Sequence, residues 1–418
     1  MNSSLLRELN PALISFATRF IGLGMQAATL FTMRLLHPAE AQALFFTAQT
    51  VLGLQFLAEF GATQAMLQRM RRAQVDPTLK PCHLLFGPYA LVASTLFLGL
   101  IVLAWAGFYG HSLPQPALLI GALALAGALR LSTVFVEAHV EGSGRINEVY
   151  RTRFVATLAS QAAMLAGMAL LSPMIALLCS TLTYVLFSKG LQRRDVRHFY
   201  SGVRLERGAL AELLSDLRAT GRYQVSLMLS AACGYLIFSG PVIVAGMVLD
   251  ASRVAEIGTS LLLASVASSL CGAIIAPYSV RIMDNMLHGR TQAAWYLERR
   301  LIAASASLFA AAVVALWLAE FMHLRALPAT QDLMLALAAY FCFSQGLVFA
   351  PGLRALGNDR MLLPSVVAAA AFAALSAGTL NHLTWGPDPL WIFAIAQGGV
   401  FLPLVLLTRR VLHRSTWT

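Results

Sequence analysis

Apolar stretches recur along the whole chain, and short polar segments separate them. Each stretch is about 20 residues long, the length that an α-helix needs to cross a hydrocarbon core of roughly 30 Å. The pattern predicts about twelve helices, at residues 10–36, 39–68, 82–108, 116–140, 152–171, 173–189, 222–249, 255–281, 298–320, 331–352, 362–381 and 389–408. Composition agrees, because only 12% of the residues are charged and 58% are hydrophobic, whereas soluble domains carry about 25% charged residues. We therefore expect an all-α polytopic membrane protein.

Basic residues gather on one side of the predicted helices. If the N-terminus is inside, the loops and helix ends on that side carry 25 of the 30 Lys and Arg residues. Because such loops stay in the cytoplasm, we expect both termini to be cytoplasmic and the chain to lie in the cell inner membrane. The same bias accounts for the net charge of +11, and it also attracts anionic lipid headgroups. We expect no nucleic-acid partner.

The sequence divides into two halves. Its longest hydrophilic stretch, residues 189–222, has six predicted helices on either side. The second part of that stretch, "ALAELLSDLRAT", repeats leucine at helical spacing and predicts an amphipathic helix at the inner surface. The halves begin alike, with "TMRLLHPAEAQALFFTA" and "AGMVLDASRVAEIGTSL". We therefore expect an N-terminal lobe (1–200) and a C-terminal lobe (201–418) of six helices each around a central cavity, a known transporter plan.

Residues 34–68, "RLLHPAEAQALFFTAQTVLGLQFLAEFGATQAMLQ", resemble the start of the polysaccharide-lipid flippases of the multidrug/oligosaccharidyl-lipid/polysaccharide (MOP) exporter superfamily. The shared pattern is a basic residue with leucines, then Pro38, an aromatic start to the second helix and a later Phe-Gly pair. A second stretch, "VEGSGRINEVYRTRF" (140–154), is similar to the inner loop after the fourth helix of that family. The chain departs at Gln42 and Ala43, where relatives usually place a glycine. With twelve helices in two lobes, the resemblance favours the Wzx-type O-antigen branch.

This resemblance implies a transporter that flips polyprenyl-diphosphate-linked oligosaccharide, a precursor of O-antigen or another surface polysaccharide, by alternating access. Its expected partners are the lipid-linked substrate, membrane lipids and other membrane proteins of polysaccharide assembly. No cofactor is expected. The sequence shows no phosphate-binding loop and no nucleophile elbow, so we expect neither an ATP-driven pump nor an enzyme. The five cysteines show no metal-binding spacing.

Arg19 lies near the middle of the first predicted span, where a charge costs at least about 2.5 kcal/mol and should face protein or water. Its helix face is otherwise small or polar, with Ser15, Gly22, Gln26 and Thr29. In an antiparallel hairpin, Glu59 of the second helix lies at a similar depth, one turn after Gln55. Two roles for Arg19 stay open: a structural ion pair with Glu59, and a contact with the substrate's diphosphate, for which arginine is suited.

Helix four offers a second pair of charges, Arg130 and Glu137, which lie seven residues apart on one face of its inner half, with His139 nearby. They can support the helix structurally or contact substrate. The candidate substrate-binding residues are therefore Arg19, Gln26, Gln55, Glu59 and Arg130.

Two other functions compete with the flippase. A drug/cation antiporter of the same superfamily needs an acid in its cavity, and only Glu59 and Glu137 lie well inside predicted spans, whereas a central arginine suits anions better. A membrane-embedded polysaccharide polymerase or ligase needs a sizeable external loop that holds catalytic residues. The predicted outer loops, such as "YGHSLPQ" and "HLTWGPDP", are short.

The predicted topology can be tested with a reporter enzyme that is active only outside the inner membrane. Fusions near Gln115, Arg253, Thr330 or Asp388 should be active, because these positions fall in outer segments. Fusions near Gln74, Arg204 or Arg290 should be silent. An active fusion at Arg204 would overturn the arrangement of twelve helices in two lobes.

Overall fold

The computed structural model describes residues 3–59, 61–63, 67, 70, 86–104, 117–201, 207–322, 327–355, 362–380 and 388–415. Every element in these residues is a helix. Within them, nine helical spans are long and apolar enough to cross a membrane, and three shorter apolar helices cover Phe20–Leu36, Tyr89–Ala104 and Leu363–Ser376. Each predicted span overlaps a described helix, so the predicted all-α polytopic membrane fold is confirmed.

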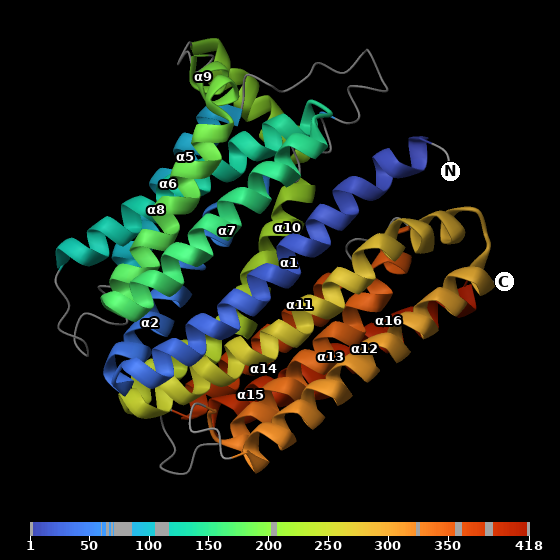
Figure 1. Cartoon of the computed structure of the whole chain (residues 1–418). Coiled ribbons are helices and arrows are strands. Elements are labelled where there is room, and N and C mark those ends of the chain that lie inside the picture. The colour runs from blue at the N-terminus through green and yellow to red at the C-terminus, as the bar shows by residue number, and fades with distance from the viewer. Residues whose placement is uncertain are drawn as a thin grey trace. The chain divides into compact units, whose positions relative to one another are not determined.

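The helices follow one another in chain order as labelled in Figure 1. They are α1 (Ser3–Leu36), α2 (Ala39–Leu52), α3 (Gln55–Glu59), α5 (Phe86–Ala104), α6 (Ala117–Gly142), α7 (Ile146–Leu170), α8 (Pro173–Leu191), α9 (Arg193–Ser201), α10 (Arg207–Val248), α11 (Ala251–Leu287), α12 (Thr291–Phe321), α13 (Thr330–Ala355), α14 (Leu362–Leu380), α15 (Pro389–Ile395) and α16 (Leu402–Ser415). A π-helical turn, Ala396–Phe401, joins α15 to α16.

Packing divides the chain into two compact units. Unit 1 comprises Met1–His37 and Thr47–Ala232, and unit 2 comprises Pro38–Phe46 and Cys233–Thr418. The boundaries fall inside α2 and α10, so each of these helices passes from one unit into the other. The division into functional lobes, 1–200 and 201–418, stays a prediction.

The sequence predicts two helix breaks, and the structure has one of them. The break predicted at "LLSPM" is confirmed, because the Ser172 hydroxyl caps α8 by accepting a bond from the Ile175 N–H at 3.3 Å and Pro173 occupies the first turn. The amphipathic stretch "ALAELLSDLRAT" is helical as predicted, but it is continuous with the seventh span in the 42-residue α10. No proline interrupts the chain between them, and the lone Gly221 is tolerated. The separate short helix is α9 instead.

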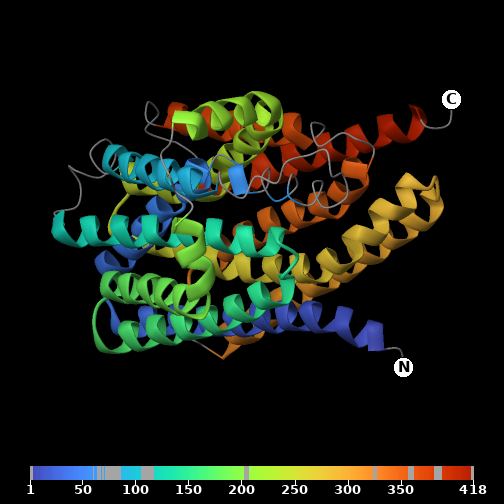
Figure 2. The same ribbon diagram turned by 90° about the horizontal axis from the view of Figure 1, so that it is seen from above.

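In unit 1, α7 packs along both α8 and α1, and α6 packs against α5 and α8. The green α7 and α8 lie side by side in Figure 1 and again in Figure 2. The carbonyl of Met168, in the last turn of α7, accepts a hydrogen bond from His37 Nε2 at 2.6 Å. This bond satisfies one of the carbonyls that a helix end leaves unpaired, and it fixes the end of α1 to the end of α7.

In unit 2, α11 is the central helix and packs against α12 and α13. Small residues let these helices approach closely, as is typical inside membranes. Ser268 of α11 and Ser344 of α13 share a hydrogen bond of 3.0 Å, and the Gln345 amide donates to Ser305 of α12 at 2.6 Å. A layer of small polar contacts therefore links all three helices.

Gly167 marks a close approach between α7 and α8. A Cβ atom at this position would lie 2.8 Å from the Cα atom of Ala176, which cannot move without shifting α8. We expect Gly167→Ala to destabilise the protein by about 1–3 kcal/mol, the usual cost of overpacking, and to lower the thermal unfolding midpoint in detergent.

Gly121 of α6 is the matched control, because a Cβ there meets nothing within 4 Å. We expect Gly121→Ala to leave the unfolding midpoint unchanged or to raise it slightly. Equal midpoints for the two variants would contradict the close α7–α8 packing.

Candidate functional site

The predicted site residues all lie in unit 1, on three of its helices. Gln26 is half-buried on α1, and the side chain of Arg19 on the same helix lies outside the described residues. Gln55 begins α3 and Glu59 ends it, both half-buried. Arg130 is half-buried midway along the span Leu119–Gly142 of α6.

Packing places these helices in two pairs. The short α3 packs against α6, so the helix that carries Gln55 and Glu59 adjoins the helix that carries Arg130, while α1 packs along α7. Among the four site residues whose side chains are described, no hydrogen bond or ion pair joins two of them. Glu59 instead accepts a hydrogen bond from the hydroxyl of Thr63. The Arg19–Glu59 pair stays a prediction, because the Arg19 side chain lies outside the described part.

The best-defined polar cluster of unit 1 forms around Glu137 of α6, which is only 2% exposed. One carboxylate oxygen accepts a bond from Arg153 Nε of α7 at 2.7 Å. The other accepts bonds from the hydroxyls of Tyr184 and Ser188 of α8, both at 3.0 Å. Arg153 also lies 3.8 Å from Glu141, one turn further along α6. This buried charge on α6 is therefore paired and hydrogen-bonded by side chains from two further helices, α7 and α8, as burial requires.

Arg130 lies at the edge of this cluster. Its guanidinium carbon is 5.2 Å from the centre of the Tyr184 ring, within the range of a cation–π contact. Since Arg153 already neutralises Glu137, the seven-residue spacing between Arg130 and Glu137 does not produce an ion pair. In the described part of the chain, Arg130 has no carboxylate partner, and its positive charge near the middle of the span is not neutralised.

Sequence reasoning singled out Arg130 and Glu137 but did not pair Glu137 with Arg153. A register argument could have found the pair. The turn between α6 and α7 lies around Arg145, and Glu137 and Arg153 stand eight residues before and after it. The partners on α8, Tyr184 and Ser188, are four residues apart and so share a helix face, but nothing in the sequence indicates which face meets α6.

Unit 2 neutralises its charges near the helix ends. Arg253, in the first turn of α11, bonds Asp332 in the first turn of α13 and Asp388 at the start of α15. Near the other end of the unit, Arg409 of α16 pairs with Glu298 of α12, which is 2% exposed. The Arg253 bonds tie together the starts of α11, α13 and α15, and the Arg409–Glu298 pair ties α16 to α12.

The described residues contain no group of three or more His, Cys, Asp or Glu side chains that could hold a metal ion. Four of the cysteines, Cys179, Cys233, Cys271 and Cys342, are free thiols.

No protein-family profile matches the chain, and no curated protein matches it by sequence. Solved structures do match it over nearly its full length. An inward-facing multidrug-resistance MATE family transporter of the MOP superfamily has a TM-score of 0.66 at 13% identity, with 97% of this chain and 99% of that chain covered. The chain has the fold of the MOP-superfamily transporters.

Two further neighbours share this MOP fold. The lipid II flippase MurJ, in an inward-closed conformation, has a TM-score of 0.62 at 12% identity and covers 96% of this chain and 87% of its own. A MOP superfamily transporter from Pyrococcus furiosus, described by the reverse polarity of its binding pocket, has a TM-score of 0.54 at 15% identity. The match covers 96% of this chain and 95% of that chain. All three neighbours are transporters rather than enzymes, and the MOP fold is that of a multi-pass membrane protein.

The Glu137 cluster predicts a large effect of losing its arginine. Arg153→Met should leave Glu137 as a buried charge without its cationic partner and destabilise the protein by about 3–5 kcal/mol, seen as a lower unfolding midpoint and a lower membrane abundance. Arg151→Met is the control, because Arg151 is exposed one half-turn away. Adding Glu137→Gln to Arg153→Met should recover much of the loss. No recovery in the double variant would contradict the pairing.

Proposed function

We propose that this chain flips a polyprenyl-diphosphate-linked oligosaccharide, the precursor of O-antigen or another surface polysaccharide, across the inner membrane by alternating access. The substrate carries a diphosphate that must leave water when it enters the protein. A fixed positive charge inside the membrane stabilises that anion, and arginine can donate two parallel hydrogen bonds to a phosphate.

The observation that carries this proposal is that Arg130 has no carboxylate partner among the described residues. Its charge lies in the middle of a membrane span, where an unneutralised cation is expensive. The carboxylate on its own helix, Glu137, is taken by Arg153, Tyr184 and Ser188. Arg130 contacts an aromatic face instead, which holds the guanidinium without neutralising it. An anionic ligand can therefore supply the missing charge.

The structural neighbours are compatible with this chemistry. MurJ is a lipid II flippase, so the MOP fold accommodates the flipping of a lipid-linked substrate. The Pyrococcus furiosus transporter is described by reversed pocket polarity, so the charge of the pocket can change on this fold. An arginine-bearing interior in this chain fits a substrate of opposite charge to the cations of a drug antiporter.

The drug/cation antiporter is the second candidate, and Glu59 is the residue that would favour it. Of the two acids that the sequence places well inside the spans, Glu137 is held by Arg153, whereas Glu59 accepts its described hydrogen bond from a neutral hydroxyl. Exchange of a cation for protons would have to use Glu59. This candidate predicts that Glu59→Gln abolishes transport while Arg130→Gln does not.

The flippase predicts the opposite pattern for cells whose own gene is deleted. Deletion should make lipid-linked oligosaccharide accumulate on the inner leaflet and remove the surface glycan. Wild-type chain should restore the glycan, whereas Arg130→Gln should lower it about tenfold or more, since a lost charge-assisted hydrogen bond costs roughly 1.5–3 kcal/mol. Arg130→Lys should retain part of the function because the charge stays while the bidentate geometry is lost.

Tyr184→Phe is the matched control, since it keeps the ring under Arg130 and removes only one of the hydrogen bonds to Glu137. It should restore the glycan nearly as well as wild type. Membrane abundance must be measured for every variant. Normal surface glycan with Arg130→Gln at normal abundance would exclude a substrate contact for Arg130, and efflux of an organic cation that depends on Glu59 would favour the antiporter.

A further inference from the structure

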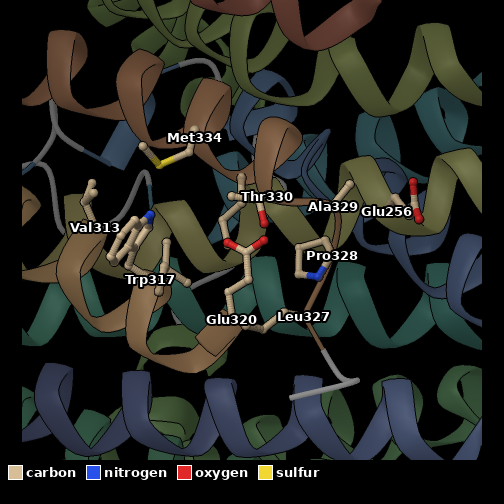
Figure 3. Close-up of a pocket in the computed structure, with 11 residues that line it drawn as sticks. Glu256, Val313, Trp317, Glu320, Leu327, Pro328, Ala329, Thr330 and Met334 are labelled. Atoms are coloured by element: carbon tan, nitrogen blue, oxygen red, sulfur yellow. The ribbon is translucent and has the colours of Figure 1, made fainter. Parts of the chain in front are cut away.

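Unit 2 contains a cavity of about 700 Å³ that the proposed transport function does not use. It lies between the end of α12, the start of α13 and the first turns of α11. Figure 3 shows Trp317 and Glu320 from α12 and Ala329 and Thr330 from the start of α13 around the same space. The volume is typical of a site for one small molecule or one lipid headgroup.

Two carboxylates line the cavity. Glu320 is exposed and has no ion-pair partner among the described residues, and Glu256 is half-buried and bonded to Arg253 at 3.0 Å. Among the residues that the structure describes, no basic side chain lines the cavity. The two carboxylates can accept hydrogen bonds from an ammonium group, and charge-assisted bonds of this kind are the strong ones.

The start of α13 favours an anion. Ala329 and Thr330 line the cavity where α13 begins. The first N–H groups of a helix have no acceptor within the helix, and they attract phosphate. The acid in this first turn, Asp332, does not line the cavity, and both of its carboxylate oxygens are bonded to Arg253. The Thr330 hydroxyl adds one further donor.

The remaining wall is apolar and continues along α12. Leu316, Leu333 and Met334 line the cavity, and Trp317 is 74% exposed beside them. Further apolar side chains, Val314, Leu318 and Phe321, are exposed on the same stretch of α12. Tryptophan at the end of a membrane span is typical of the membrane–water interface. The surface therefore offers space for acyl chains directly below the polar cavity.

We propose that this cavity binds one phospholipid whose headgroup is zwitterionic with a primary ammonium, as in phosphatidylethanolamine. The ammonium lies between Glu320 and Glu256, the phosphate lies at the start of α13, and the acyl chains run along Trp317 and the exposed face of α12. The predicted topology places this lipid in the outer leaflet. The carboxylates exclude an anionic headgroup, and a quaternary ammonium cannot donate the hydrogen bonds that the carboxylates accept.

The test is native mass spectrometry of the whole chain in mild detergent, titrated with phosphatidylethanolamine, phosphatidylcholine and phosphatidylglycerol that carry the same acyl chains. We expect the first to bind about fivefold more tightly than the other two, the factor that corresponds to roughly 1 kcal/mol. Glu320→Gln and Glu256→Gln should each remove most of this preference. Thr330→Val should weaken phosphatidylethanolamine and phosphatidylcholine alike, because both carry the phosphate.

Glu148→Gln is the matched control. Glu148 is an exposed acid bonded to an arginine three residues before it, at 3.1 Å, as Glu256 is bonded to Arg253 at 3.0 Å, but it lies in unit 1 away from the cavity. It should leave the lipid preference unchanged, and all variants should keep the wild-type unfolding midpoint.

Three results would overturn the proposal. The first is equal binding of the three lipids to the wild-type chain. The second is an unchanged preference in Glu320→Gln and Glu256→Gln. The third is displacement of phosphatidylethanolamine by dodecyltrimethylammonium with the same dependence on Glu320, which would make the ligand a soluble cation. None of these results bears on flipping, so the lipid site can fail while the flippase stands.

Discussion

The pairing of Glu137 with Arg153 is the interaction on which the polar interior of unit 1 depends. Glu137 is nearly sealed from solvent, and a carboxylate in that position is tolerated only with a cation and further donors. Arg153 supplies the cation, and Tyr184 and Ser188 supply the remaining donors. Three helices, α6, α7 and α8, are thereby held in one register. The same bonds hold the Tyr184 ring in place, and the Arg130 guanidinium lies over this ring. The Glu137 cluster therefore positions Arg130 without neutralising its charge.

In unit 2, the charged side chains are also paired, but at other positions along the helices. Arg253 pairs with Asp332 and Asp388 and joins the starts of α11, α13 and α15. Arg409 of α16 pairs with Glu298, which lies two turns from the start of α12. The middle of its bundle is held by neutral contacts, such as the hydrogen bond between Ser268 and Ser344. A buried neutral group that loses its partner costs about 1–3 kcal/mol, whereas a buried charge that loses its partner costs about 3–5 kcal/mol. The ends of the unit are therefore fixed more firmly than its centre.

Much of the fold follows from the sequence, because a bilayer permits few arrangements of an apolar chain. The length and spacing of the apolar runs predicted helices that the structure describes, and the break at Ser172–Pro173 was visible as a cap followed by a proline. The continuity of α10 could not be predicted, because an amphipathic pattern shows which face of a helix is apolar but not where the helix ends. The site was predicted only in part. A lone charge in an apolar run indicates Arg130. Which side chains contact Arg130 and Glu137 depends on how α6, α7 and α8 are rotated against one another. This rotation depends on packing at residues such as Gly167.

The distribution of charge along the spans then assigns different tasks to the two units. In unit 1, Arg130 stands midway along the span Leu119–Gly142, and Arg19 stands near the middle of the first span that the sequence predicts. The described spans of unit 2 carry their arginines nearer to the span ends. A substrate that carries a diphosphate through the membrane needs a counter-charge at mid-depth, since the cost of its charge is greatest there. Among the described spans, the one that carries an arginine at that depth, Leu119–Gly142 with Arg130, belongs to unit 1. In the proposed flippase, the arginine at mid-depth in unit 1 is therefore the group expected to bind the diphosphate.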